Sequence, residues 1–337
     1  MSVDISNGIE EGNIVIKVVT CNTTSITLVT DKRFAGKVLQ PDVKATRALA
    51  EHGLAMSIRI TTNDTSHHIL LDTGGLNGTF MKNGENLKMG LDDVEKIILS
   101  HGHFDHFGGL MDLIPKLKAG AEIYLNPICF EQNQVVFTAE GIEIPAEELG
   151  PNLRKLEKEG KILRTAKLPT LNKEKIFNLA DQHNIKIIET NKSEKLYNGV
   201  ITSGEIEIFN EEEVTKGIYL VKSRKELENH TFRDETSLYI NVKDKGLIIL
   251  TGCAHTGIIN TIKHGQKLTG IEKIYAIIGG LHKEYESNEN IKESVEFIEN
   301  LNPEVTCGMH CTGFRFNTVM MRHPSHTLGI VGTEFHL

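Results

Sequence analysis

Apolar and polar positions divide the chain into many short strands and a few amphipathic helices. Residues 13–20 (NIVIKVVT) alternate and are rich in β-branched side chains, which favours a strand. Further strands are predicted where apolar runs occur, at residues 55–61, 67–72, 96–99, 122–125, 206–209, 217–221, 237–242, 246–251, 274–278 and 303–307. Helical patterns occur at residues 79–89, 91–95, 108–118, 257–267 and 291–301. Strands interleaved with helices in two halves favour an α/β fold, a four-layer αβ/βα sandwich.

The pattern changes between residues 131 and 205. Lys and Glu become frequent there, helical and strand periods mix, and no chemical motif occurs. We interpret this segment as an insertion or lid on a single domain of residues 1–337, and a dimer arm is an alternative role. The usual ~150 residues per domain would predict two domains, but layered α/β folds often exceed that length.

The composition and charge of the chain exclude several classes of protein. The chain is 39% hydrophobic and 24% charged, which is typical of a folded globular protein. No apolar run approaches the ~20 residues that span a bilayer, and the acidic N-terminus does not resemble a signal peptide. A net charge of −8 with dispersed Lys and Arg disfavours nucleic acid as a partner. Five cysteines without C-x-x-C spacing do not predict a disulfide framework, so we expect a cytoplasmic protein.

The strongest chemical signal lies in residues 100–109 (SHGHFDHFGG), which follow a predicted buried strand and precede a helix. In an extended chain residues two apart point the same way, so His101 and His103 are predicted to chelate one ion together. Asp105 and His106 lie where the chain turns into the helix and are predicted to address a second ion. Imidazoles and a carboxylate suit Zn, Fe, Mn or Co. An ordinary polar surface loop is the alternative, but it does not explain the H-x-H-x-D-H spacing.

Other candidate ligands also follow predicted strands. His255 and His310 are predicted metal ligands, with helix capping or packing as the alternative roles. His282, after Gly279-Gly280, is predicted to support a ligand from outside the coordination shell or to contact substrate. Cys253 is either a thiolate ligand that favours zinc or buried filler. His52 is interpreted as structural.

The H-x-H-x-D-H motif, with D-T-G at residues 72–74 ahead of it, resembles the metallo-β-lactamase fold superfamily. Four further segments resemble the subgroup of dihydropterin–ribofuranosylaminobenzene-phosphate synthase-like metallohydrolases: residues 50–54 (AEHGL), 250–255 (LTGCAH), 279–282 (GGLH) and 310–313 (HCTG). The resemblance runs from about residue 14 to the C-terminus and is weakest within 131–205. The resemblance implies a metallo-β-lactamase-type sandwich with an inserted segment. It also implies that the protein binds one or two divalent ions, with zinc as the expected metal and manganese or iron as alternatives.

The resemblance also implies roles for single residues. In the superfamily a third histidine completes the shell of the first ion, and here either His230 or Asp234 falls in that region. A bridging aspartate is expected where this chain has Cys253. Asp72 is expected to be a buried carboxylate that orients a ligand histidine through its ring N–H.

The implied activity is that of a hydrolase with a dinuclear metal site. A metal-bound hydroxide would attack a small, phosphorylated or pterin-like substrate, with Asp105 as the catalytic residue that orients it and relays its proton. Backbone N–H groups near Gly280, Thr312 and Gly313 are predicted to bind an anionic group of the substrate.

Other functions stay open at the level of sequence. The subgroup's name implies a synthase that joins an aminobenzene to a dihydropterin and releases pyrophosphate, which a fold alone does not establish. The further alternatives are a non-haem iron oxidoreductase and a non-catalytic ligand-binding protein on a degenerate site. We expect a small molecule as the partner, without nucleic acid or membrane, and leave a homodimer open.

Overall fold

The computed structural model describes residues 2–25, 27–41, 47–62, 65–131, 134–138, 144–223 and 226–337. Within these ranges the strands form three sheets, ordered β2-β18-β1-β3-β4-β5-β6-β9, β10-β11-β14-β15-β16-β17 and β13-β12-β7-β8. The eight-stranded sheet contains β1 (Ile14–Thr20), β2 (Val38–Leu39), β3 (Ala55–Thr62), β4 (Thr65–Leu71), β5 (Lys96–Ile98), β6 (Glu122–Leu125), β9 (Lys186–Glu189) and β18 (Glu334–His336). The six-stranded sheet contains β10 (Lys195–Tyr197), β11 (Val200–Thr202), β14 (Leu238–Val242), β15 (Gly246–Thr251), β16 (Ile274–Gly280) and β17 (Val305–Met309). The small sheet contains β7 (Gln134–Thr138), β8 (Ile162–Lys167), β12 (Ile218–Ser223) and β13 (Glu226–Asn229).

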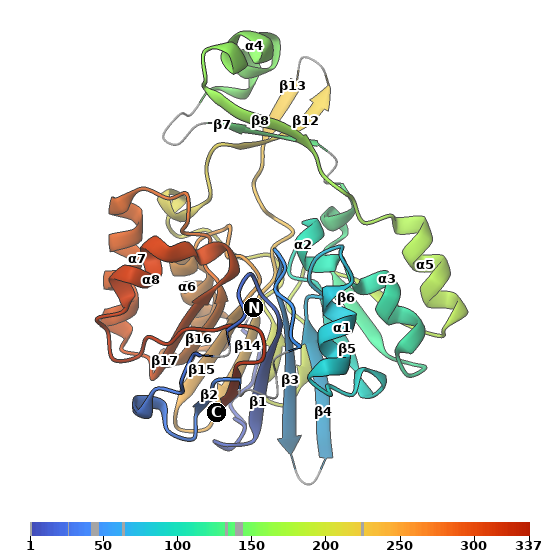
Figure 1. Ribbon diagram of the computed structural model, residues 1–337, viewed down its shortest axis with the longest axis vertical. Helices are drawn as coiled ribbons and strands as arrows, with labels where there is room; N and C mark the ends of the chain where they lie inside the picture. The colour runs from blue at the N-terminus through green and yellow to red at the C-terminus, as the bar shows by residue number, and fades with distance from the viewer. Residues whose placement is uncertain are drawn as a thin grey trace.

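The two large sheets face each other and helices cover their outer faces (Figure 1). The helices are α1 (Thr79–Asn86), α2 (Phe104–Phe107), α3 (Leu110–Leu113), α4 (Ala146–Lys158), α5 (Lys173–Gln182), α6 (Ile258–Thr269), α7 (Asn288–Leu301) and α8 (Gly313–Met320). Ile58 and Leu71 of one sheet pack with Ile248 and Ile278 of the other in one buried cluster. Each such side chain contributes about 1.5–3 kcal/mol when fully buried. The predicted four-layer α/β sandwich is therefore confirmed.

The direction of the strands determines where the site forms. β4, β5 and β6 run parallel in one sheet, and β15, β16 and β17 run parallel in the other. Every described side chain of β15 and β16 is buried, as expected for parallel strands covered on both faces. The carboxyl ends of parallel strands meet at one edge of a sheet, which is where α/β proteins bind ligands. The residues that follow these strands are the histidine motifs of the sequence.

The small sheet and α4 stand above the edge of the sandwich that carries α2 (Figure 1). They have a core of their own, formed by the buried side chains Val136, Leu149, Leu156, Ile162, Tyr219 and Leu227. Part of the start of the predicted insertion, residues 132, 133 and 139–143, lies outside the described residues. α5, β9, β10 and β11 fall within residues 131–205 but belong with the two large sheets, whereas β12 and β13 lie beyond residue 205 and complete the small sheet. Local periodicity does not show such pairing between distant segments.

Two predicted elements differ for local reasons. The helix predicted at residues 108–118 ends as α3 at Leu113 and continues as a 3₁₀ turn with Pro115 in its first turn, because proline has no N–H for the helical ladder. Residues 206–209 do not form a strand, since the Phe209 amide donates to Asn260 Oδ1 and the Glu207 amide to His264 Nδ1. No helix in the described part of the chain is both long and apolar enough to cross a membrane.

Candidate metal centre

Loops after the parallel strands bring the predicted ligands together. His101 and His103 follow β5, Asp105 and His106 form the first turn of α2, and His255 and His310 follow β15 and β17. Within the described residues, four sets of three ligand atoms each lie within 4.8 Å of one another: His101, His103 and His255; His101, His106 and Cys253; His52, Asp105 and His310; and Cys253, His282 and Cys311.

The first set consists of three imidazoles. His101 Nε2 and His103 Nδ1 are 3.0 Å apart. Burial lowers the pKa of His101 and of His255 well below the usual value, and it lowers the pKa of His103 to about 4. These side chains are therefore neutral at physiological pH, which is the form that binds metals. Both ring nitrogens of His255 are buried without a hydrogen-bond partner among the described residues, so they are oriented for a ligand that the protein itself does not supply.

The set of His52, Asp105 and His310 is organised around a carboxylate. Asp105 Oδ2 lies 3.2 Å from His310 Nε2, 3.2 Å from His52 Nε2 and 3.7 Å from His106 Nε2. Burial acts to raise the pKa of Asp105, but His106, His310 and His52 outweigh it and hold that pKa well below the usual range. The interpretation of His52 as purely structural missed this contact. Its side chain is 64% exposed, so it forms the outer side of the set.

Asp72 is a buried carboxylate that contacts His106 directly and His101 through Ser100. Its Oδ2 accepts hydrogen bonds from His106 Nδ1 and Ser100 Oγ, both at 2.7 Å, and its Oδ1 accepts from the Ser100 amide at 2.7 Å. Ser100 Oγ in turn lies 2.9 Å from His101 Nδ1. We assign N–H to both Nδ1 atoms, which leaves Nε2 of each ring to face the site; at His106 an ion would replace the proton that this basic ring carries at Nε2. A Cβ at Gly252 would collide with Ser100 Oγ and Asp72 Oδ2, so only glycine fits there.

The same network makes His106 a strong base. Burial alone would lower the pKa of His106, but the carboxylates of Asp72 and Asp105 outweigh it and raise that pKa to about 9. A more basic imidazole is a better metal ligand. Cys253 Sγ lies 3.2 Å from His106 Nε2 at the position where the superfamily resemblance predicts a bridging aspartate.

His230 and Asp234 are the two candidates for the position of the superfamily's third histidine, and both make contacts outside the four ligand sets. Asp234 Oδ2 accepts a hydrogen bond from the Gly102 amide at 2.8 Å and thereby supports the loop of the motif. His230 stacks on Phe232 with ring centroids 3.9 Å apart, and Phe232 stacks on His255 at 4.3 Å. His255, and neither of these two residues, shares a ligand set with His101 and His103.

Two residues that the sequence analysis missed position the ligand loops. Asn22 Oδ1 lies 2.9 Å from His310 Nδ1 and accepts a hydrogen bond from the Gly53 amide. The buried Glu235 carboxylate accepts hydrogen bonds from the amides of His255 and Thr256, at 2.6 and 2.7 Å. Burial raises the pKa of Glu235 to about 7. No local pattern marks either residue, because each acts on a loop far away in the sequence.

The predicted anion-binding groups are largely engaged within the protein. The Gly280 amide donates to Gly252 O, and Thr312 Oγ1 accepts from the Leu281 amide. Gly313, with φ of 73°, packs against the Glu284 carboxylate. In this conformation Gly280 N–H and Thr312 Oγ1 contribute to holding the strand ends together, and a role in substrate binding stays a prediction.

Backbone strain gathers around the site. Left-handed φ values occur at Asp72 (63°), Phe232 (50°), Ala254 (55°), His282 (44°) and His310 (53°), and all five residues carry a side chain. Such conformations cost of order 1–3 kcal/mol each and cluster at functional sites. Phe232, a bulky aromatic residue, is the most unusual of them.

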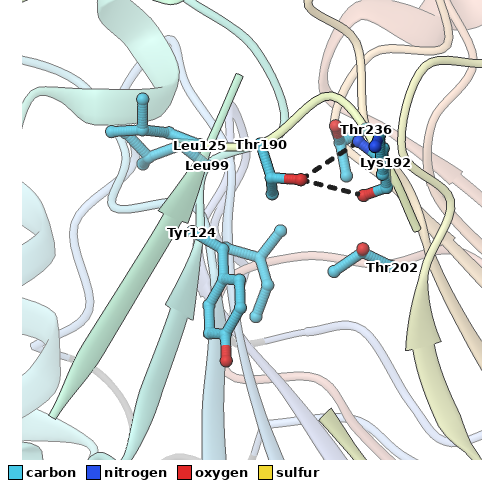
Figure 2. Close-up of a pocket in the computed structure, with 8 residues that line it drawn as sticks. Leu99, Tyr124, Leu125, Thr190, Lys192, Thr202 and Thr236 are labelled. Atoms are coloured by element: carbon cyan, nitrogen blue, oxygen red, sulfur yellow. Dashed lines mark hydrogen bonds between the residues drawn. The ribbon is translucent and has the colours of Figure 1, made fainter. Parts of the chain in front are cut away.

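A pocket between the two large sheets is separate from this cluster. It is lined by Ile98, Leu99, Tyr124, Leu125, Thr190, Lys192, Thr202 and Thr236, and by none of the candidate ligands (Figure 2). The Lys192 amide donates to Thr190 Oγ1 across its rim. Its empty space of about 210 Å³ includes open solvent, and small-molecule sites usually enclose about 300–1,000 Å³. We therefore place the functional site at the histidines.

Comparisons with known proteins agree with this geometry. A family model described as the metallo-beta-lactamase superfamily matches residues 53–163. A Methanocaldococcus jannaschii protein named 7,8-dihydropterin-6-methyl-4-(beta-D-ribofuranosyl)-aminobenzene-5'-phosphate synthase is 33% identical over 277 residues, which cover 81% of this chain and 84% of that protein. An uncharacterized protein of the same organism is 27% identical over 298 residues, 88% of this chain and 97% of its own.

A crystal structure described as a metal-dependent hydrolase of the beta-lactamase superfamily shares the fold. Its TM-score is 0.64 at 20% identity, with 96% of this chain and 99% of that chain covered. The family model, the synthase-named relative and the shared fold confirm the resemblance seen in the sequence. The chain belongs to the metallo-beta-lactamase superfamily, in the subgroup of the synthase-named relative.

Proposed function

We propose that this protein is a metal-dependent hydrolase that acts on a small, phosphorylated or pterin-like molecule. The observation that carries the proposal is the convergence of two ligand sets, one of three histidines and one built on Asp105, at the carboxyl ends of the parallel strands. The relative at 33% identity, whose name contains a dihydropterin and a phosphate, supports the substrate class.

The residues present fit divalent ions. His101, His103 and His255 would hold one ion. Asp105 and His310 would hold another, with His106, whose Nε2 lies 3.7 Å from Asp105 Oδ2, as a further ligand. The unpartnered ring nitrogens of His255 and the short network behind His106 are the features of this structure that favour the assignment. Bound zinc or manganese would supply Lewis acidity and lower the pKa of a water molecule toward about 7.

The chain's own groups position the reactants. Asp105 Oδ2 faces both His52 and His310, so it would orient the attacking water and relay its proton toward these imidazoles. Phe232 and His230 connect β13 of the small sheet to the ring of His255. This supports a lid role for the small sheet and α4, which would close over a bound substrate and exclude water.

The test is elemental analysis with a phosphoesterase assay on the same sample of wild-type protein. We expect about two ions per chain at the histidine and aspartate ligands, and turnover of p-nitrophenyl phosphate esters. His103→Ala is expected to lose both, whereas His183→Ala, which changes a histidine outside every ligand set, is expected to retain both. Turnover that persists after the metal has been removed would rule out the proposed hydrolase.

The name of the relative favours a second candidate function, the synthase reaction itself. The protein would join an aminobenzene ribofuranosyl phosphate to a dihydropterin pyrophosphate ester and release pyrophosphate. Incubation of both substrates with the metal-loaded protein, followed by mass spectrometry, separates the two candidates. A joined product together with pyrophosphate supports the synthase, and phosphate ester cleavage without joining supports the hydrolase.

A further inference from the structure

Three residues with soft ligand atoms gather on one side of the histidine cluster. Cys253, His282 and Cys311 follow β15, β16 and β17, which are neighbouring parallel strands. Two thiol sulfurs and one ring nitrogen of these residues lie within 4.8 Å of one another. Both cysteines are free thiols. The fold brings them together although they are 58 residues apart in the chain.

The strand ends are shaped around these side chains. A Cβ at Gly280 would lie 2.9 Å from Cys311 Sγ, too close for that sulfur to keep its position, and in tight contact with Cys253 Cα at 3.2 Å. Ala254, next to Cys253, has a left-handed backbone at φ of 55°, and His282 itself has φ of 44°. Strain at two of the three strand ends is maintained only when the surrounding structure holds it, and it is typical of ligand sites.

The donor atoms of this set contact one another, since Cys311 is a hydrogen-bond partner of both His282 and Cys253. His282 Nδ1 is buried without a hydrogen-bond partner among the described residues. Cys311 Sγ makes a weak contact of 3.7 Å with Cys253 O. Two thiolates and one imidazole form the ligand set of tetrahedral zinc sites that keep a fourth position open.

We propose that Cys253, His282 and Cys311 bind a thiophilic divalent ion, zinc, beside the histidine and aspartate centre. Cys253 Sγ is 3.2 Å from His106 Nε2, so this sulfur links the soft position to the main centre. The chain therefore binds one ion more than its histidine and aspartate ligands alone would hold, and that ion has two sulfur ligands.

Cys307 provides a matched control. It lies on β17, four residues before Cys311, and is likewise a free thiol. Its sulfur is packed in the apolar cluster between the large sheets and belongs to none of the four ligand sets. Substitution of Cys307 therefore changes a buried thiol outside the proposed site, whereas substitution of Cys311 changes one of its ligands.

The experiment is a titration of metal-free protein with Co²⁺ under reducing conditions, followed by its sulfur-to-cobalt charge-transfer absorption. We expect the wild type and Cys307→Ser to give the same band and the same number of bound ions. Cys311→Ser is expected to bind one ion fewer and to lose at least half of the band, because one sulfur and one imidazole no longer hold cobalt at this site. A Cys311→Ser band equal to that of the wild type, or no band in the wild type, would overturn the proposal.

If Cys311→Ser does not fold, X-ray absorption spectroscopy of the zinc-loaded wild type tests the proposed site instead. We expect sulfur scatterers at about 2.3 Å, with an amplitude that corresponds to two sulfurs on one ion. A single sulfur would assign Cys253 alone to the main centre and refute the soft site. Neither measurement depends on hydrolase or synthase activity, so the proposed function can fail while this site stands.

Discussion

Replacement of Asp72 by Asn tests whether the carboxylate behind the histidines determines metal affinity. Asn is nearly isosteric and tolerates the left-handed φ of 63°, so the backbone can stay in place. Asn Oδ1 would still accept the Ser100 amide. The amide nitrogen at the other position, however, donates hydrogen bonds and cannot accept them from His106 Nδ1 and Ser100 Oγ.

The magnitude follows from the lost contact. A hydrogen bond to a charged group contributes about 1.5–3 kcal/mol, and each 1.4 kcal/mol is a tenfold change in affinity. In the variant His106 would also favour N–H at Nε2, the atom that faces the site. We expect Asp72→Asn to weaken zinc binding by about 10- to 100-fold.

Competition with a chromophoric chelator measures this affinity, and circular dichroism monitors the fold. Asp93→Asn is the matched control, because Asp93 accepts a hydrogen bond from His68 Nδ1 in a carboxylate–histidine pair outside every ligand set. We expect the control to bind zinc as the wild type does. Equal zinc affinity in folded Asp72→Asn and in the wild type would refute the orienting role of the carboxylate.

Three further predictions concern ligands, pH and a buried ion pair. His103→Ala and His106→Ala should each lose bound metal while keeping the wild-type circular dichroism spectrum, and unchanged metal content in both variants would contradict the ligand assignment. Burial raises the pKa of Glu235 from 4.5 to about 7, so between these pH values the folded state holds a proton that the unfolded state has lost. The contribution of this proton to the free energy of unfolding is full below about pH 4.5 and declines as the pH rises to about 7. Denaturant unfolding at about pH 5 and about pH 8 should therefore show a smaller pH dependence in Glu235→Gln than in the wild type, and an equal dependence would disprove this origin. Lys283→Met should cost about 3–5 kcal/mol of unfolding free energy, because it leaves the buried Glu213 carboxylate, 3.1 Å from Lys283 Nζ, without its ion-pair partner. Adding Glu213→Gln should recover part of this loss. Full additivity of the two substitutions in the double variant would show that the pair is not coupled.

The local sequence pattern was sufficient to predict the strands that position the site. Alternation and β-branched residues place β1, and continuous apolar runs place β5 and β15. These strand predictions succeed because periodicity is a property of a few adjacent residues. The H-x-H-x-D-H spacing predicts metal-binding chemistry from equally local information.

Tertiary structure decided which distant residues meet. It groups His255, rather than His230 or Asp234, with His101 and His103. It also brings His52 to Asp105, and it completes the small sheet with strands from beyond the predicted insertion. The choice depends on the direction and register of strands far apart in the chain, which no local pattern contains. Cys253 and Cys311 become neighbours for the same reason, since their strands flank β16 and all three end at one edge of the sheet.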